Sequence, residues 1–224
     1  MITDSVRLKF DILPPAQRAL WPQFSQLSDP WVLYGGTALA LRLGHRESID
    51  FDFFTFRSFD AGALMEQLPF QDEAVVVQRE QNTLTLSVGR DAPVKVSFFG
   101  VPKLGQVREP EVDAESGIRI ASWLDLAGTN AATVQVRAEA KDYIDIDALI
   151  ESGVGLDWAC AAALAIYGPS AHPLGTLKAL SYFEDGNLAK VSESTRRRLA
   201  AAAREVDPLS LPSVGSVYRR RNDE

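Results

Sequence analysis

Residues 35–54, which read GGTALALRLGHRESIDFDFF, decide the fold of this chain. Side chains alternate along a β-strand, so in the strand expected over residues 49–54 Asp50 and Asp52 point to one face and the intervening phenylalanines to the other. The two carboxylates then lie about 7 Å apart by strand rise, although aspartate is depleted in strands. A divalent cation offsets their repulsion, and hard oxygen ligands favour Mg²⁺. The pattern therefore predicts a metal held by Asp50 and Asp52.

The glycine pair ahead of this strand predicts an anion site. Gly35 and Gly36 end a short apolar strand and open a helix at Thr37. Backbone amides at a helix N-terminus, unobstructed by a Cβ, bind phosphate, and the Thr37 hydroxyl adds one more donor. Arg46 and Ser48, just ahead of the aspartate strand, are placed for further phosphate contacts. A phosphate cradle that faces a carboxylate pair is what metal-assisted phosphoryl or nucleotidyl transfer needs.

Outward from this stretch, the first half of the chain alternates between helices and strands, and the second half is helical. Helices are expected over residues 16–27, 37–43 and 61–67, and strands over 31–34, 49–54, 74–78, 83–88, 94–99 and 118–120. Later helices are expected over residues 122–138, 142–151, 156–165, 174–182 and 192–205. The order predicts an α+β fold: a mixed β-sheet flanked by helices over residues 1–121, then an all-helical lobe over residues 122–224 with a frayed C-terminal tail.

Composition excludes several classes of protein. The 224 residues are 46% hydrophobic and 24% charged, which suits one core or a core with a small lobe. The net charge of −7 gives no overall basic field, so contact with nucleic acid is expected to be local, at the arginines of residues 196–198 or 219–221, unless these are only solvated charge. A single cysteine, Cys160, excludes an intrachain disulfide framework. The absence of a leader and of a long apolar stretch predicts a cytoplasmic protein with no membrane partner.

The glycine and aspartate stretch resembles the AbiEii/AbiGii-type nucleotidyltransferases of bacterial toxin–antitoxin systems, within the polymerase-β-like superfamily. The resemblance continues into DLAG at residues 125–128, RAEAKDYIDI at 137–146 and KALSYF at 178–183. It implies a mixed sheet that carries the aspartates and is followed by a helical domain. It also implies transfer of a nucleoside monophosphate from an NTP to an acceptor, which for some members is tRNA, and an antitoxin partner.

The resemblance adds Lys141 and Asp142 to the candidate catalytic residues. Lys141 and Asp145 are spaced i, i+4 on the expected helix, and Asp142 and Asp145 are spaced i, i+3. A surface ion pair, with acidic residues favouring a helix N-terminus, explains this cluster without a function. The resemblance implies instead that Lys141 contacts phosphate and that Asp142 anchors the helical lobe or assists the chemistry.

Two positions depart from the superfamily pattern. A later strand of the superfamily usually supplies a third carboxylate, whereas the matching strand has Ser97, which shares one face with Lys95 and Phe99 by alternation. A serine cannot act as a charged general base. Asn130 stands where relatives often carry a lysine, on the inward stripe of its helix, and therefore needs a polar partner. Three functions stay open: an active nucleotidyltransferase, a non-catalytic nucleotide-binding or partner-binding module, and a kinase-like transfer of the γ-phosphoryl group.

Overall fold

A computed structural model describes residues 8–27 and 31–215 of the chain. The chain divides into two compact units. The first comprises Met1–Leu104 and Pro110–Ala121, and the second comprises Gly105–Glu109 and Ser122–Glu224. In the described part of the chain, the first unit holds the strands and the second holds the later helices. The arginines at residues 219–221 and the end of the expected tail lie outside the described residues.

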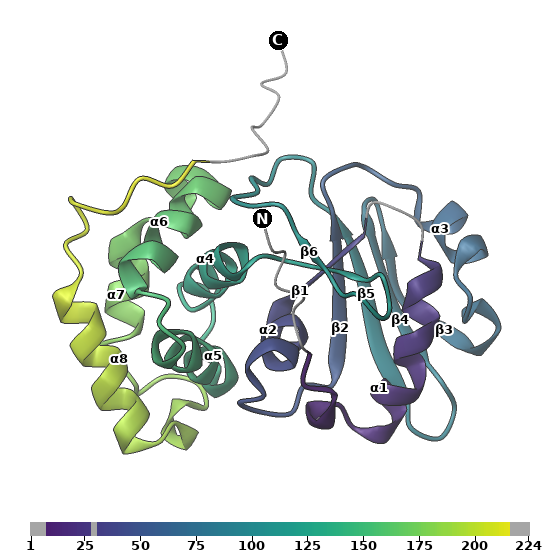
Figure 1. Ribbon diagram of the computed structural model, residues 1–224, viewed down its shortest axis with the longest axis horizontal. Coiled ribbons are helices and arrows are strands. Elements are labelled where there is room, and N and C mark those ends of the chain that lie inside the picture. Colours follow the sequence, from purple (N-terminus) through teal and green to yellow (C-terminus); the bar gives the residue numbers. More distant parts are fainter. Residues whose placement is uncertain (1–7, 28–30, 216–224) are drawn as a thin grey trace, which may run out of the picture. The chain divides into compact units, whose positions relative to one another are not determined.

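A seven-stranded mixed sheet, with the order β3-β4-β5-β2-β1-β7-β6, forms the first unit (Figure 1). The strands are β1 (Val32–Tyr34), β2 (Asp50–Thr55), β3 (Ala74–Glu80), β4 (Thr83–Val88), β5 (Val94–Gly100), β6 (Glu111–Val112) and β7 (Arg119–Ile120). The pairs β2–β5 and β1–β7 are parallel and the other pairs are antiparallel. The mixed sheet followed by helices confirms the predicted α+β class.

Among the described residues of this unit, the sheet is accompanied by three α-helices: α1 (Pro15–Leu20), α2 (Gly35–Leu43) and α3 (Ala61–Gln67). The predicted helix over residues 16–27 is correct only in part, because α1 ends at Leu20 and a 3₁₀ helix, η2 (Trp21–Gln26), follows it. Pro22 lies in the first turn of η2 and has no N–H to donate, which ends the α-helical hydrogen bonding. Two further 3₁₀ turns are η1 (Phe10–Ile12) and η3 (Gln71–Glu73).

The core of the first unit is rich in aromatic rings. The ring centroid of Phe24, in η2, lies 4.7 Å from that of Phe51 and 4.9 Å from that of Phe53. Phe51 and Phe53 both belong to β2. Phe53 also stacks on Phe98 of β5 at 5.5 Å. Such ring pairs add about 0.5–1.5 kcal/mol each beyond the area they bury. Burial of the β2 phenylalanines fixes the side-chain alternation of the strand, so that its aspartates face away from this core.

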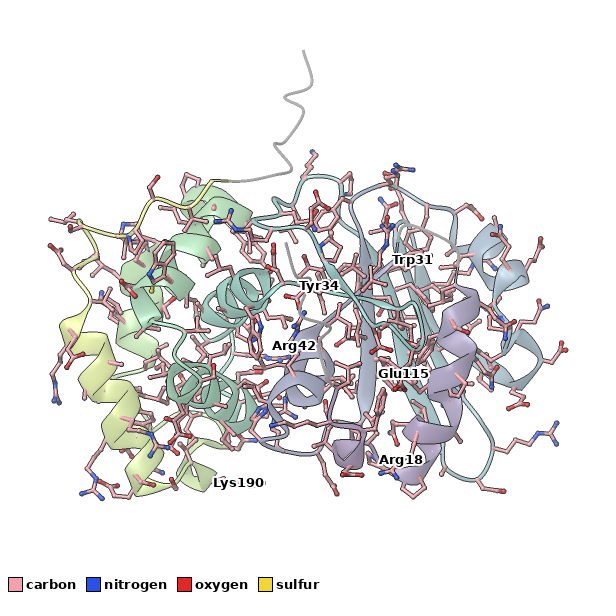
Figure 2. The ribbon with its side chains drawn as sticks, viewed as in Figure 1. Arg18, Trp31, Tyr34, Arg42, Glu115 and Lys190 are labelled. Atoms are coloured by element: carbon pink, nitrogen blue, oxygen red, sulfur yellow. The ribbon has the colours of Figure 1, made fainter. Side chains whose placement is uncertain are left out.

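A buried arginine fixes α2 to the far edge of the sheet. Arg42, labelled in Figure 2, has a side chain that is 0% exposed. Its Nη1 lies 3.0 Å from Oε2 of Glu111 in β6. Its Nη2 donates to the carbonyl of Ala121 at 2.8 Å, just after β7. The sequence did not predict β6, a strand of two residues whose position depends on this ion pair and on its pairing with β7.

The second unit is a set of helices: α4 (Trp123–Thr133), α5 (Ala140–Glu151), α6 (Leu156–Tyr167), α7 (Pro173–Ala179) and α8 (Glu193–Glu205). Helix α4 ends at Thr133 rather than at the expected residue 138. Asp147 of α5 accepts hydrogen bonds from Thr195 Oγ1 and Arg198 Nε of α8, at 2.8 and 2.9 Å, and so connects the two helices. No single described helix is long and apolar enough to cross a membrane; α5 with the segment Leu156–Ser170 passes that test only as a pair, bent by 120°.

Residues 105–109 group with the second unit because Asp125 binds their backbone. Its two carboxylate oxygens accept from the amides of Val107 and Arg108, at 2.8 and 3.0 Å. Ser122 caps α4 and also donates to Asp125. Burial raises the pKa of Asp125 above its usual value, while these hydrogen bonds oppose the rise. The carboxyl group therefore has a structural role at the start of α4.

Candidate functional site

The two aspartates of β2 share one face of the sheet. Phe51 and Phe53 are fully buried on the opposite face, whereas Asp50 and Asp52 are half-buried. This is the alternation that the sequence predicted. The carboxylate of Asp50 forms no hydrogen bond or ion pair with any other residue that the structure describes, so its oxygens are available to a cation.

Asp52 lies against the bend at which α2 begins. Gly35 has φ +72°, and a Cβ built on it would come within 3.0 Å of Asp52 Oδ2. The antiparallel register of β1 and β2 explains this approach, because it pairs Tyr34 with Asp52. No side chain caps the N-terminus of α2. The backbone amides of its first turn, at Gly35, Gly36 and Thr37, therefore donate no capping hydrogen bond to a side chain. The structure thus brings the glycine bend and the aspartate pair together.

Thr37 and Ser48 connect the start of α2 to the start of β2. The Thr37 hydroxyl donates to Ser48 Oγ at 2.7 Å and also contacts the carbonyl oxygen of Asp50. Both side chains are buried, with Thr37 only 2% exposed. Their hydroxyls therefore hold β2 beside α2, and the backbone amides of the turn are the better donors for a phosphate. The expected contact between the Thr37 hydroxyl and phosphate stays a prediction.

Arg46 lies in the loop between α2 and β2, at the same end of the unit. It is half-buried, and its Nη1 donates to the carbonyl of Glu47 at 2.9 Å. The neighbouring His45 is also half-buried. The expected contacts of Arg46 and Ser48 with phosphate stay predictions.

Lys141 and Asp142 belong to the second unit and pair with their neighbours there. Asp142 is 3% exposed and accepts from Arg137 Nε and Nη2, at 2.7 and 2.8 Å. Lys141 is exposed and lies 3.1 Å from Glu139. The two-pronged bond with Arg137 gives Asp142 an anchoring role at the start of α5. Its role in chemistry, and the contact of Lys141 with phosphate, stay predictions.

The two unusual positions have polar partners of their own. Ser97 of β5 lies in register with Asp52, is 1% exposed, and receives a long hydrogen bond of 3.5 Å from the Thr85 hydroxyl. Asn130 is buried in α4 and donates to the carbonyl of Leu126 at 2.8 Å, which meets the need for a partner within its own helix. Ser97 is therefore the neighbour of Asp52 in the adjacent parallel strand.

The described residues contain no group of three or more His, Cys, Asp or Glu side chains that could hold a metal. Asp50 and Asp52 supply two carboxylates. Mg²⁺ is usually held by one or two carboxylates together with substrate phosphates and water, rather than by a cage of protein ligands. The aspartate pair therefore fits a magnesium ion that arrives with a nucleotide.

The arginines at residues 196–198 are used within the second unit. Arg198 pairs with Asp147, and Arg197 lies 3.7 Å from Glu193. Arg196 donates to the carbonyl of Leu188 at 2.9 Å. The run therefore contributes to the packing of α8, which favours the structural interpretation of these charges.

Comparison with known proteins places the chain in a family. Residues 18–220 match the sequence profile of the family described as "Nucleotidyl transferase AbiEii toxin, Type IV TA system". The chain is also 33% identical over 122 residues to an uncharacterized protein, aq_aa25, of Aquifex aeolicus (strain VF5). That alignment covers 54% of this chain and 57% of the relative, so the chain spans little more than half of the relative's length. The family match extends over both units, and on that ground the chain belongs to the AbiEii nucleotidyl transferase toxin family of type IV toxin–antitoxin systems.

Proposed function

We propose that this chain is a magnesium-dependent nucleotidyltransferase that moves a nucleoside monophosphate from an NTP to an acceptor, with tRNA as the first acceptor to test. We further propose that it acts as the toxin of a pair with an antitoxin. The observation that carries the proposal is the close approach of Asp52 to the Gly35 bend, because a carboxylate beside the uncapped start of a helix suits a cation and a phosphate together. The family match supports the reaction class and the toxin role.

Each part of the site has a role in this reaction. Asp50 and Asp52 would hold the cation, which when bound neutralises charge on the phosphate oxygens. The first-turn amides of α2 and the helix dipole favour the phosphates of the same nucleotide. The acceptor hydroxyl forms a bond to the α-phosphorus, the bond from that phosphorus to the bridging oxygen breaks, and pyrophosphate leaves. The hydroxyl proton passes to solvent, because Ser97 beside Asp52 cannot serve as a general base.

The test is transfer of label from α-labelled NTPs to a pool of tRNA. The variants Asp50→Asn and Asp52→Asn are compared with Asp91→Asn, which changes an exposed aspartate in the turn between β4 and β5. We expect the first two to lose transfer by about 10²–10³-fold, the scale of losing one electrostatic stabiliser, while they stay folded and Asp91→Asn stays active. Transfer that survives either site substitution would show that the metal site is assigned wrongly. Transfer from γ-labelled rather than α-labelled NTP would indicate a kinase instead.

A second candidate, a nucleotide-binding module without catalysis, is favoured by Ser97 at the position beside Asp52. Calorimetric titration with each of the four Mg–NTPs separates it from the enzyme. Binding without transfer to any acceptor in the tRNA pool supports the module, and binding with transfer supports the enzyme.

A further inference from the structure

The parallel register of β2 and β5 places a lysine beside the aspartate pair. Asp50 is paired with Lys95, and Asp52 is paired with Ser97. Neighbouring strands lie about 4.8 Å apart, and side chains at paired positions share a face. Lys95 is therefore one strand away from Asp50, on the face to which both aspartates point.

Lys95 is the basic side chain of this part of the sheet. The residues of β2, β4 and β5 on the aspartate face follow from the two registers: Asp50, Asp52, Phe54, Thr83, Thr85, Ser87, Lys95, Ser97 and Phe99. Apart from Lys95 and the two aspartates, the members of this set are uncharged. A positive charge close to the aspartates on these strands therefore comes from Lys95.

The ammonium group of Lys95 is available to a ligand. Lys95 is exposed, and no ion pair or hydrogen bond joins it to another described residue. It is thus not bound to Asp50, although the two side chains are neighbours. A lysine that neutralised Asp50 would compete with a cation for the carboxylate, whereas an unpaired lysine adds a separate positive charge beside the metal site.

Charge counting shows what that lysine would bind. The charges of two carboxylates and one divalent cation cancel, so the metal and its protein ligands together leave the several negative charges of a triphosphate unmatched. The helix terminus of α2 supplies only about half a positive charge. An ammonium group is a compact point charge that suits phosphate oxygens.

We propose that Lys95 binds the phosphate chain of the nucleotide beside Asp50 and gives this site its preference for a nucleoside triphosphate over a monophosphate. This inference rests on the proposed function. It differs from a role in which Lys95 only screens the repulsion between Asp50 and Asp52, because screening would act on the metal and on the fold rather than on the phosphates.

The test uses the full chain as wild type, Lys95→Ala and Lys95→Arg. Arg90→Ala is the matched control, because Arg90 is an exposed residue of the turn between β4 and β5 and its loss removes the same charge. Mn²⁺ alone is titrated by electron paramagnetic resonance. The four α,β-methylene nucleoside triphosphates and the corresponding monophosphates are titrated with Mg²⁺ by calorimetry, after thermal unfolding shows that each variant is folded.

We expect Lys95→Ala to weaken triphosphate binding about tenfold or more, the scale of one charge-assisted hydrogen bond. Binding of Mn²⁺ alone should be unchanged or tighter, and monophosphate binding should stay within about twofold, because the lost contact is to the outer phosphates. Lys95→Arg should restore most of the affinity, since it keeps the charge, and Arg90→Ala should match the wild type.

Other outcomes overturn the inference in distinguishable ways. Unchanged triphosphate affinity in Lys95→Ala, with a wild type that binds, overturns the role of Lys95 and leaves the proposed function standing. If Lys95→Ala weakens the binding of Mn²⁺, monophosphate and triphosphate equally, Lys95 only supports the carboxylate site. A wild type that binds Mn²⁺ but none of the triphosphates overturns the proposed function, and the inference with it.

Discussion

The Asp52 carboxylate lies so near the Gly35 backbone that a Cβ on Gly35 would stand 3.0 Å from Oδ2, a distance at which the carboxylate has to shift. Asp52 is a candidate metal ligand, and Gly35 opens the helix whose amides are the candidate phosphate site. This close approach joins the two halves of the proposed site at a residue whose backbone conformation and surroundings both favour glycine.

Gly35→Ala should impair the site as well as the fold. Gly35 has φ +72° and Gly117 has φ +71°, but a Cβ on Gly117 meets nothing within 4 Å. Both substitutions should cost about 1–2 kcal/mol of unfolding free energy through the left-handed backbone. We expect Gly35→Ala also to weaken Mn²⁺ binding severalfold, because the new methyl group displaces Asp52.

Urea unfolding and Mn²⁺ titration of the two alanine variants check this expectation. Gly117→Ala isolates the backbone cost, since its Cβ enters open space. Equal Mn²⁺ affinity in both variants would show that the position of Asp52 does not depend on the glycine.

Ser97→Asp should turn the aspartate pair into a three-carboxylate site. Ser97 is in register with Asp52 and is almost fully buried, so a new carboxylate there is destabilising without metal. A divalent cation that binds only the folded state should recover stability, by about 2.7 kcal/mol at a concentration 100 times its Kd. We expect the thermal shift caused by Mn²⁺ to be larger in this variant than in the wild type.

Ser97→Asn is the uncharged control for this experiment. Asparagine is similar in size to aspartate but uncharged, so Mn²⁺ should stabilise the Ser97→Asn variant no more than the wild type. If Mn²⁺ shifts both variants equally, Ser97 does not face the metal site.

Local patterns predicted the elements that position the site. Alternation of aspartate and phenylalanine defined β2. Once its phenylalanines are buried on one face of the sheet, its aspartates must point to the other face. The glycine pair marked the start of α2 because only glycine tolerates the bend at Gly35. Both features depend on neighbours in the chain, which is why sequence alone was sufficient for them.

Pairings between distant residues were not predictable in the same way. Edge strand β6 is too short to show a period, and it depends on Glu111 meeting Arg42. The Thr37 hydroxyl was expected to face a ligand, yet it is bonded to Ser48 and to β2. In the cluster near Lys141, helical spacing suggested a pair with Asp145, whereas the structure pairs Lys141 with a residue before the helix, at its N-cap.

Arg42 and Glu111 should be energetically coupled. Removing Glu111 takes this carboxylate from a fully buried guanidinium, but the Glu111 side chain is 37% exposed, so the cost should fall below the roughly 3–5 kcal/mol typical of fully buried pairs. We expect Glu111→Gln and Arg42→Met each to lower the free energy of unfolding, and the double variant to cost less than their sum. Urea unfolding of the three variants measures the coupling. Strict additivity would mean that the pair does not fix β6.

Arg137→Met and Asp142→Asn test the anchoring role of Asp142. Their two-pronged bond is charge-assisted and nearly buried at Asp142, so each change should cost about 1.5–3 kcal/mol. We expect similar losses of stability, measured by urea unfolding, and label transfer that persists in both at low temperature. Transfer lost in Asp142→Asn but kept in Arg137→Met would instead assign Asp142 to the chemistry.

The stability of the second unit should fall in alkaline solution because of Cys160. The thiol is 0% exposed in α6, and burial raises its pKa from 9.0 to about 11. Between these values the unfolded chain releases the thiol proton and the folded chain keeps it, so the stabilising contribution is complete below pH 9 and is lost as pH rises through 11. At pH 10.5 the resulting loss of unfolding free energy is about 2 kcal/mol, at 1.36 kcal/mol per unit of pKa.

Cys160→Ala isolates the contribution of this thiol. Burial also raises the pKa of Tyr167, to about 12, but both proteins carry that tyrosine and its effect cancels. We expect the free energy of unfolding to fall more in the wild type than in Cys160→Ala between pH 8 and 10.5, and iodoacetamide to label native Cys160 only as fast as the chain opens. A parallel decline in both proteins, or rapid labelling of the native thiol, would show that Cys160 is accessible to water and that α6 does not pack as described.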